Sequence, residues 1–235
     1  MSDTPLIHDE LDLLATLVPL QGIRLIELGC GKARLASALL TRYPQTEVTA
    51  LEVDERQHAK NLAAPQPRLN FVQAGAQAIP FADGCFDGAM MLKTLHHVPL
   101  PLMDQALCEV ARVLRPGGWF YVSEPVYAGP LNDIMRLVHD EGEVRLAAQQ
   151  ALDIALAQGT WEAAGEHRFE MPVHFADFAN FEQRMLQVTY ADRRMDEPTR
   201  HIIRQRFDAL MGPQGVSLTR PMHVRLLHKP RGAAI

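Results

Sequence analysis

A strand–turn–helix segment near the start of the chain constrains the fold more than any other feature. Residues 23–28 (IRLIEL) form an apolar run that predicts a strand, and residues 29–31 (GCG) follow it as a turn. Residues 33–42 predict a helix that stops before Pro44. Two glycines in such a turn let the backbone approach a ligand closely, at the carboxyl end of a strand where open α/β sheets bind ligands. The segment therefore predicts an α/β sheet with a ligand at this turn.

Short apolar runs typical of strands alternate with segments of helical periodicity as far as residue 125. Strands are predicted at residues 47–53, 69–74, 86–92 and 119–123, and helices at residues 8–19, 55–63 and 100–114. Strands that alternate with helices indicate a parallel sheet covered by helices on both faces. The strands are apolar nearly throughout, which agrees with this because a parallel sheet is buried on both sides.

The pattern changes after residue 125. Residues 129–166, which include the Ala-rich stretch AAQQALDIALA, predict a helical cap because the segment is too long for a simple loop. Residues 175–186 and 198–211 predict further helices, and residues 222–227 predict an antiparallel edge strand. We therefore expect an α/β fold, a Rossmann-like three-layer sandwich. Its mostly parallel seven-stranded sheet would have an antiparallel edge strand and a helical insertion after strand 5.

The length of 235 residues suits a single domain with an insertion. Residues 1–125 would form the cofactor-binding half, residues 126–180 the helical cap, and residues 181–235 the substrate-side elements. Three cysteines without a CxxC pair do not indicate a disulfide framework.

Charge and hydropathy bear on the partners. The formal net charge is −5 and no long basic run occurs, which makes nucleic acid an unlikely partner. No apolar run approaches the roughly 20 residues that span a bilayer, and the start lacks the basic segment of a signal peptide. We expect a cytoplasmic protein without a membrane partner, either a monomer or a homodimer.

Two side chains near the glycine turn indicate which kind of ligand the turn could bind. Arg34 occupies the last position of the dinucleotide fingerprint Gly-x-Gly-x-x-Gly/Ala, where a small residue is needed. Glu27 precedes the first glycine, where it would repel a pyrophosphate and attract a cationic amino group. A nicotinamide-dependent oxidoreductase is therefore disfavoured. The plain structural alternative is a tight turn that binds nothing.

The second predicted strand ends in acidic residues, roughly 20 residues after the turn. Glu52 follows the apolar run of this strand and could accept hydrogen bonds from both ribose hydroxyls of a nucleoside cofactor. Asp54 is expected to be the N-cap of the next helix. The alternative is that both carboxylates are surface charges.

Together, these residues carry a family resemblance. The matching stretches occur in order between residues 20 and 125, namely LIELGCGKARLASAL, VTALEVDERQ, FVQAGAQAIPFADGCFDGAMML, LHHV and EVARVLRPGGWFYVSEP. The chain resembles the class I S-adenosylmethionine-dependent methyltransferases, and within them the group that contains the ubiquinone/menaquinone-biosynthesis C-methyltransferases. The resemblance implies S-adenosyl-L-methionine as cofactor and a small-molecule methyl acceptor that reacts at an oxygen, carbon or nitrogen atom.

The resemblance also implies roles for particular residues. Glu27 would lie near the methionine amino group, Glu52 would bind the ribose and Val53 would pack against the adenine. The implied cofactor-binding residues are Glu27, Gly29, Cys30, Gly31, Glu52, Val53, Gly75, Ala76, Gln77, Lys93 and Thr94.

Two positions depart from the family pattern. Ala33 stands where the family usually has a third glycine, and Gly75 stands where it usually has an aspartate that binds the adenine amino group. The amide oxygen of Gln77 could replace that carboxylate. These departures leave an alternative open, a catalytically impaired protein that binds S-adenosylmethionine and has a regulatory role.

A general base is needed only if the acceptor carries a proton when it attacks. His97, His139, Tyr127 and His174 are candidates, and no catalytic residue is assigned among them. The absence of an Asn-Pro-Pro-Tyr motif argues against DNA adenine or protein glutamine methylation.

The histidines also raise the question of a metal. His96 and His97 are adjacent, so on a strand or helix they are not expected to face one ion. A second group in the predicted cap, His139, Asp140, Glu141 and Glu143, could form a metal or acid/base site, but a solvated helix face is favoured. We therefore predict no metal site.

Overall fold

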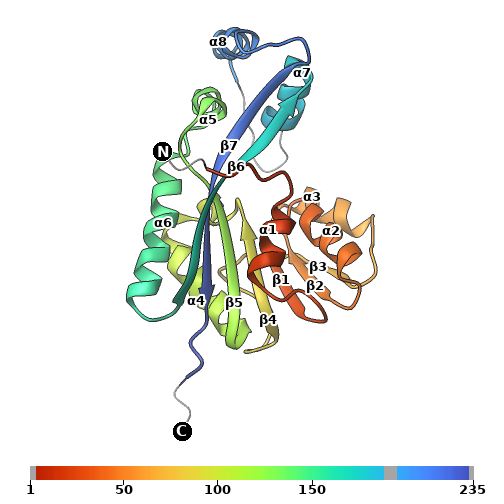
Figure 1. Ribbon diagram of the computed structural model, residues 1–235, viewed down its shortest axis with the longest axis vertical. Helices are drawn as coiled ribbons and strands as arrows, with labels where there is room; N and C mark the ends of the chain where they lie inside the picture. Colours follow the sequence, from red (N-terminus) through yellow and green to blue (C-terminus); the bar gives the residue numbers. More distant parts are fainter. Residues whose placement is uncertain (1–3, 188–194, 233–235) are drawn as a thin grey trace.

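The computed structural model describes residues 4–187 and 195–232, which form a seven-stranded sheet flanked by helices (Figure 1). The strand order is β3-β2-β1-β4-β5-β7-β6. The first five strands in this order pair in parallel, whereas β7 is antiparallel to both of its neighbours. The strands are β1 (Arg24–Leu28), β2 (Glu47–Leu51), β3 (Leu69–Val72), β4 (Phe86–Leu92), β5 (Leu114–Pro125), β6 (Glu162–Phe175) and β7 (Val216–His228).

Helices cover both faces of the sheet (Figure 1). In β1, Leu25 packs with α1 and α2 on one face, whereas its neighbour Ile26 packs with α4 and α6 on the other. This alternation is the two-residue period of a strand buried on both sides. The α-helices are α1 (Glu10–Leu17), α2 (Arg34–Arg42), α3 (Glu55–Leu62), α4 (Met103–Val113), α5 (Pro130–Met135), α6 (Gly142–Ala157), α7 (Phe178–Phe181) and α8 (Glu197–Asp208).

A separate small core lies beyond the carboxyl end of β5. Pro125 at that end pairs with Met222, so residues 216–221 of β7 continue past β5 and pair only with β6. Figure 1 shows this two-stranded extension with α5, α7 and α8 around it. Its core consists of aromatic and aliphatic side chains, among them Phe175 and Phe207. The extension rises on the side of the sheet where parallel strands bind their ligands.

The predicted order of elements through residue 125 is confirmed, with helix and strand bounds shifted by a few residues. The prediction for residues 129–166 is wrong in its last part. Residues 162–166 begin β6, which runs to Phe175, because this segment pairs along its whole length with β7. The predicted helix over residues 175–186 accordingly begins only at Phe178 and continues as a π-helical turn, η3 (Glu182–Leu186).

The predicted strand at residues 222–227 is present as part of β7, and it is antiparallel as expected. Its place in the sheet differs, because β6 lies outside it and forms the edge. No helix in the described ranges is long and apolar enough to cross a membrane.

Candidate active site

The turn after β1 has a left-handed backbone at three positions. Gly29, Gly31 and Ala33 have φ angles of 67°, 52° and 48°. A Cβ atom on Gly29 would lie 2.2 Å from the Cγ2 atom of Thr94, whereas one on Gly31 would meet nothing within 4 Å. Gly29 is therefore required by close packing and Gly31 by its conformation alone, with open space beside it.

Glu27 is the penultimate residue of β1 and places a buried carboxyl beside this turn. Its side chain is 5% exposed, and its Oε2 atom has no hydrogen bond among the described residues. Burial raises the pKa of Glu27 to about 8, Lys93 lowers it and Glu52 raises it further. A buried carboxyl oxygen of this kind is suited to a cationic donor.

Glu52 has a structural task that the sequence did not reveal. One of its carboxylate oxygens accepts a hydrogen bond from the backbone N–H of Gly31 at 2.7 Å, and the other accepts one from that of Asp54 at 2.9 Å. The side chain thereby ties the end of β2 to the glycine turn. The prediction that Asp54 caps α3 is confirmed, since its carboxylate accepts from the N–H of Arg56. Val53 is 63% exposed between the two acidic residues.

Gln77 lies over Gly75. A Cβ atom on Gly75 would lie 2.4 Å from the Oε1 atom and 2.6 Å from the Nε2 atom of the Gln77 side chain. The amide therefore occupies the space into which a side chain at residue 75 would project. This geometry fits the hypothesis that Gln77 supplies the acceptor that an aspartate supplies elsewhere.

Lys93 and Thr94 follow β4 at the same end of the sheet. The hydroxyl of Thr94 donates to the carbonyl oxygen of Gly29 at 3.2 Å, so it contacts the glycine turn. Lys93 has a φ of 56°, and its Nζ atom lies 3.4 Å from Glu10 of α1. Glu10 is buried and also accepts from the hydroxyl of Tyr121. The involvement of Glu10 was missed, because nothing in its local sequence marks it.

A buried histidine–carboxylate pair lies beside these residues. The Nδ1 atom of His96 bonds to one oxygen of Glu124, the penultimate residue of β5. The other oxygen of Glu124 accepts from the backbone N–H groups of Thr94 and Leu95 at 3.1 and 2.8 Å. Glu124 thus fixes both the turn after β4 and the His96 ring. The sequence had indicated it only as part of a matching stretch.

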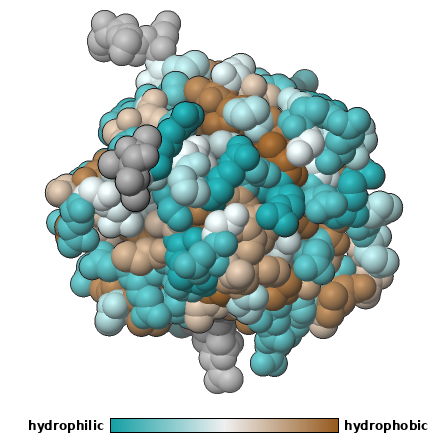
Figure 2. All heavy atoms as spheres, turned by 90° about the horizontal axis from the view of Figure 1, so that it is seen from below, coloured by the Kyte–Doolittle hydropathy of each residue, from teal (hydrophilic) through white to brown (hydrophobic). Residues whose placement is uncertain are grey.

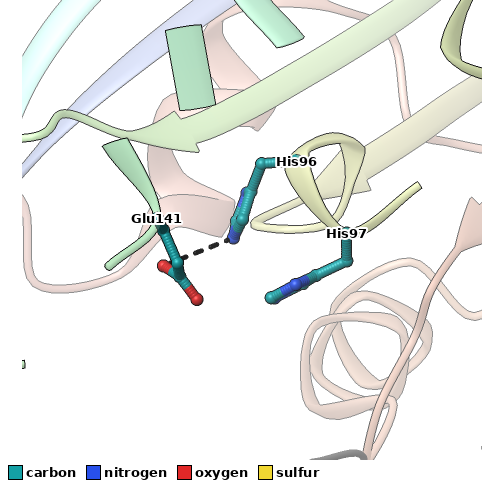
Figure 3. A group of neighbouring side chains, drawn as sticks. All are labelled: His96, His97 and Glu141. Carbon is teal, nitrogen blue, oxygen red and sulfur yellow. Dashed lines mark ion pairs between the residues drawn. The ribbon is translucent and has the colours of Figure 1, made fainter. Parts of the chain in front are cut away.

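His97 and Glu141 lie next to His96 (Figure 3). The Nε2 atom of His96 is 3.8 Å from Glu141, and the rings of His96 and His97 have centroids 4.0 Å apart. One ligand atom from each of the three residues lies within 4.8 Å of the others. The expectation that the adjacent histidines would not face one ion is therefore wrong, because they lie in a short 3-10 turn, η1 (Leu95–His97), rather than in a strand or α-helix.

Burial and neighbouring charges together set the pKa values of His97 and Glu141. Part of the His97 ring is exposed, yet loss of water around it lowers the pKa of His97 to about 4, and His96 adds to the effect. Burial raises the pKa of Glu141, but His96 and Arg145 outweigh it, so that pKa is lowered. His97 is accordingly neutral and Glu141 ionised at neutral pH.

The other predicted base candidates are dispersed. His139 joins the cluster, with its Nε2 atom 3.6 Å from Glu141. Tyr127 is half-exposed, and its hydrogen bond to Asp140 raises the pKa of its phenol. His174 lies in the two-stranded extension and bonds to Ser217 instead.

Comparison with known proteins assigns part of the chain to a family. Residues 26–122 match the family described as a methyltransferase domain. These residues form a class I methyltransferase domain. A fatty-acid O-methyltransferase from Mycolicibacterium smegmatis is 34% identical over 149 residues, which cover 59% of this chain and 50% of the relative.

A second relative, 27-O-demethylrifamycin SV methyltransferase from Amycolatopsis mediterranei, is 35% identical over 46% of this chain and 40% of its own length. The chain spans about half the length of the curated relatives it matches. Among solved structures, the YcgJ protein from Bacillus subtilis has the same fold, with a TM-score of 0.67 and 17% identity over 94% of this chain and 98% of that one.

Beside the methyltransferase domain, a cavity of about 290 Å³ opens between the domain and the extension. Lys93, His96 and His97 line it from the domain, and the rest of its lining comes from the end of β5, from α5, α6, η3 and β7, and from the loops on either side of α5. A larger hollow of about 440 Å³ lies around Gly117 and Lys229, at the opposite end of the sheet. Figure 2 views the molecule from that end, where hydrophilic side chains predominate and hydrophobic ones are scattered among them. The smaller cavity is the one that the domain's histidine cluster faces.

Proposed function

We propose that the chain transfers the methyl group of S-adenosyl-L-methionine to a small-molecule acceptor held in the cavity beside η1. The observation that carries the proposal is a buried carboxyl oxygen of Glu27 that has no hydrogen-bond partner among the described residues, beside the glycine turn of a methyltransferase domain. An ammonium group would satisfy this oxygen and shift Glu27 to its ionised form. A pyrophosphate carries negative charge and would oppose the ionised form of Glu27 instead.

The residues of the turn fit the parts of this cofactor. Glu27 would pair with the amino group of the methionine part, and the backbone of Gly29 and Gly31 would line that part. Glu52, already bonded to Gly31 and Asp54, would accept from the ribose hydroxyls with its remaining lone pairs. Exposed Val53 would cover the adenine, whose amino group would meet the Gln77 amide. The cofactor supplies an electrophilic methyl group on a sulfonium.

The protein's contribution to the reaction is positioning. Holding the acceptor in line with the methyl group and excluding water are the main sources of rate for such a displacement. The turn after β4 would face the reacting atoms, since Thr94 contacts the glycine turn and Lys93 and His96 line the cavity. The names of the relatives above favour an oxygen as the accepting atom.

A proton on the acceptor would be taken up within the histidine cluster. Glu124 holds the Nδ1 side of His96 and leaves its Nε2 side toward Glu141, and His97 is neutral at pH 7. His97 and His139 remain the proposed bases, with His96 as the residue that positions them. The expectations of a monomer or homodimer and of a cytoplasmic location stay predictions, as does the division into residues 1–125, 126–180 and 181–235.

Titration calorimetry with S-adenosylmethionine tests the proposal. We expect binding to the wild-type chain and at least ten-fold weaker binding to Glu27→Gln, because the amide cannot neutralise an ammonium group. Glu55→Gln, at an exposed position on α3, is the matched control and should bind like the wild type. Absence of wild-type binding at millimolar cofactor contradicts the proposal.

A further inference from the structure

The charge of the cavity beside η1 is opposite to that of the whole chain. The protein carries a formal net charge of −5. Among the described residues, the cavity is lined by four cationic side chains, Lys93, Arg145, Arg184 and Arg220, and by one carboxylate, Glu141. These five side chains therefore carry a formal excess of about three positive charges, which concentrates anions.

These cationic side chains come from four separate segments of the chain. Lys93 follows β4, Arg145 lies on α6, Arg184 on η3 and Arg220 on β7. Only the tertiary fold brings them to one cavity. The carboxylate among them is already engaged, because Arg145 binds Glu141 through two nitrogens at 2.6 and 3.2 Å.

The rest of the lining includes an apolar wall. Leu131 and Met135 of α5, Val126 after β5 and Met185 of η3 face the same space. A cavity of about 290 Å³ with cations and an apolar wall suits a ligand that has both an anionic group and a hydrocarbon body.

A divalent cation is the competing occupant, because His96, His97 and Glu141 offer three ligand atoms close together (Figure 3). Two observations oppose it. Glu141 would have to bind the ion while its charge is compensated by Arg145 at 2.6 Å. The ion would also add two positive charges to a lining that already has an excess of them.

We propose that the acceptor held in this cavity is an amphipathic anion, an aliphatic chain that carries a carboxylate. The guanidinium groups of Arg184 and Arg220 would hold the carboxylate, and the side chains of α5 would cover the chain. This inference rests on the proposed function, since it names the substrate class of the same site.

Calorimetry with octanoate tests the charge preference, in the presence and in the absence of S-adenosylhomocysteine. Octan-1-ol and octylammonium have the same chain length with no charge and with the opposite charge, and acetate has the anion without the chain. We expect octanoate to bind at least ten-fold more tightly than any of these three, and its affinity to fall when KCl is raised from 50 to 500 mM. Tighter binding of octylammonium, or equal binding of octan-1-ol, overturns the inference.

Variants that remove one positive charge test whether octanoate binds in this cavity. Arg184→Gln and Arg220→Gln should each weaken octanoate binding at least five-fold, whereas Arg56→Gln, exposed on α3, should not change it. If a variant fails to fold, the ligand series on the wild type still decides the matter. Titration with Mn²⁺ and Zn²⁺ tests the competitor, and ion binding that octanoate does not displace favours a metal site over the inference.

These experiments distinguish failure of the anion-site inference from failure of the proposed methyl transfer. S-adenosylhomocysteine binding without octanoate binding overturns this inference and leaves methyl transfer standing. Octanoate binding without S-adenosylhomocysteine binding supports the anion site and contradicts the proposed function.

Discussion

At the scale of single residues, Ala33 shows what a non-glycine residue costs at a left-handed position of the glycine turn. Ala33 has a φ of 48° and is buried. A left-handed conformation costs an L-residue roughly 1–2 kcal/mol, which explains why a glycine suits this position. Alanine is the smallest departure from it, so the turn keeps its shape.

We expect Ala33→Gly and Ala33→Val to differ in a defined order. Ala33→Gly relieves backbone strain, but it raises the entropy of the unfolded chain, which costs about 0.4–1 kcal/mol, and removes a buried methyl group. Because these effects oppose one another, its free energy of unfolding should stay within about 1 kcal/mol of the wild-type value. Ala33→Val should lose about 2 kcal/mol or more, because a β-branched residue is a true outlier at positive φ. Urea denaturation measures both. Equal stability of the two variants would show that the backbone at residue 33 relaxes.

Glu27 should make stability depend on pH. Its folded-state pKa of about 8 lies above the ordinary value of 4.5, so its contribution to stability is complete below pH 4.5 and is lost as the pH rises through 8. Glu27→Gln removes this loss, and at pH 8.5 the variant should be more stable than the wild type by on the order of a few kcal/mol. Melting temperatures of both proteins between pH 5 and 9 measure the difference. A constant difference across that range would mean that Glu27 does not titrate there.

Gln77 should matter for cofactor affinity. If its amide replaces the missing carboxylate at residue 75, Gln77→Ala should weaken S-adenosylmethionine binding by about 1 kcal/mol, roughly five-fold. The double variant Gly75→Asp/Gln77→Ala should recover the loss, because removal of the Gln77 side chain frees the space that a Cβ at residue 75 needs. Calorimetry compares the three proteins. If Gln77→Ala binds S-adenosylmethionine as tightly as the wild type, Gln77 does not contribute to cofactor binding.

At the scale of secondary-structure elements, the end of β5 organises the turn after β4. Glu124 is 2% exposed and receives two backbone N–H groups in addition to His96. One carboxylate therefore links β5, η1 and the histidine cluster. The sequence places Glu124 at the end of a strand but cannot show which turn it faces, because Thr94 is 30 residues away.

We expect Glu124→Gln to lower the free energy of unfolding by about 3 kcal/mol or more, since an amide turns a donor group toward other buried donors. Glu143→Gln on the exposed face of α6 should change it by less than about 0.5 kcal/mol. Denaturant midpoints provide the comparison. A loss in Glu124→Gln no larger than that in Glu143→Gln would contradict the role of the carboxylate.

At the scale of the whole molecule, the chain has a sheet with two cores on its faces and a third core in the extension. The glycine turn belongs to the sheet, whereas part of the cavity wall belongs to the extension. Cofactor binding and acceptor binding should therefore respond differently to damage in the third core.

Phe207→Ala tests this separation. Phe207 is fully buried against Phe175, Phe178 and Phe181, so truncation should cost about 3–5 kcal/mol within the extension. Hydrogen exchange should speed up in residues 170–181 and 216–221 but not in β1 or β4, and S-adenosylmethionine should still bind. Faster exchange throughout the sheet would show that the cores unfold as one unit.

The sequence by itself determined the order of elements through residue 125, the glycine turn and the methyltransferase domain of residues 26–122. These three features can be predicted from local patterns, because the periodicity of a strand or helix and the positions of the glycines are both contained in short stretches of chain. It also indicated Glu27 and Thr94, whose places follow directly from strands that the pattern reveals.

Only the tertiary structure decided the rest. Residues 162–175 form a strand because β7 pairs with them, not because of their own pattern. The partners Glu10 with Lys93 and His96 with Glu141 join distant segments, so no local pattern could have predicted them. The cationic cavity arises in the same way. Its four cationic side chains come from separate segments of the chain, and only the packing of those segments brings them to one space.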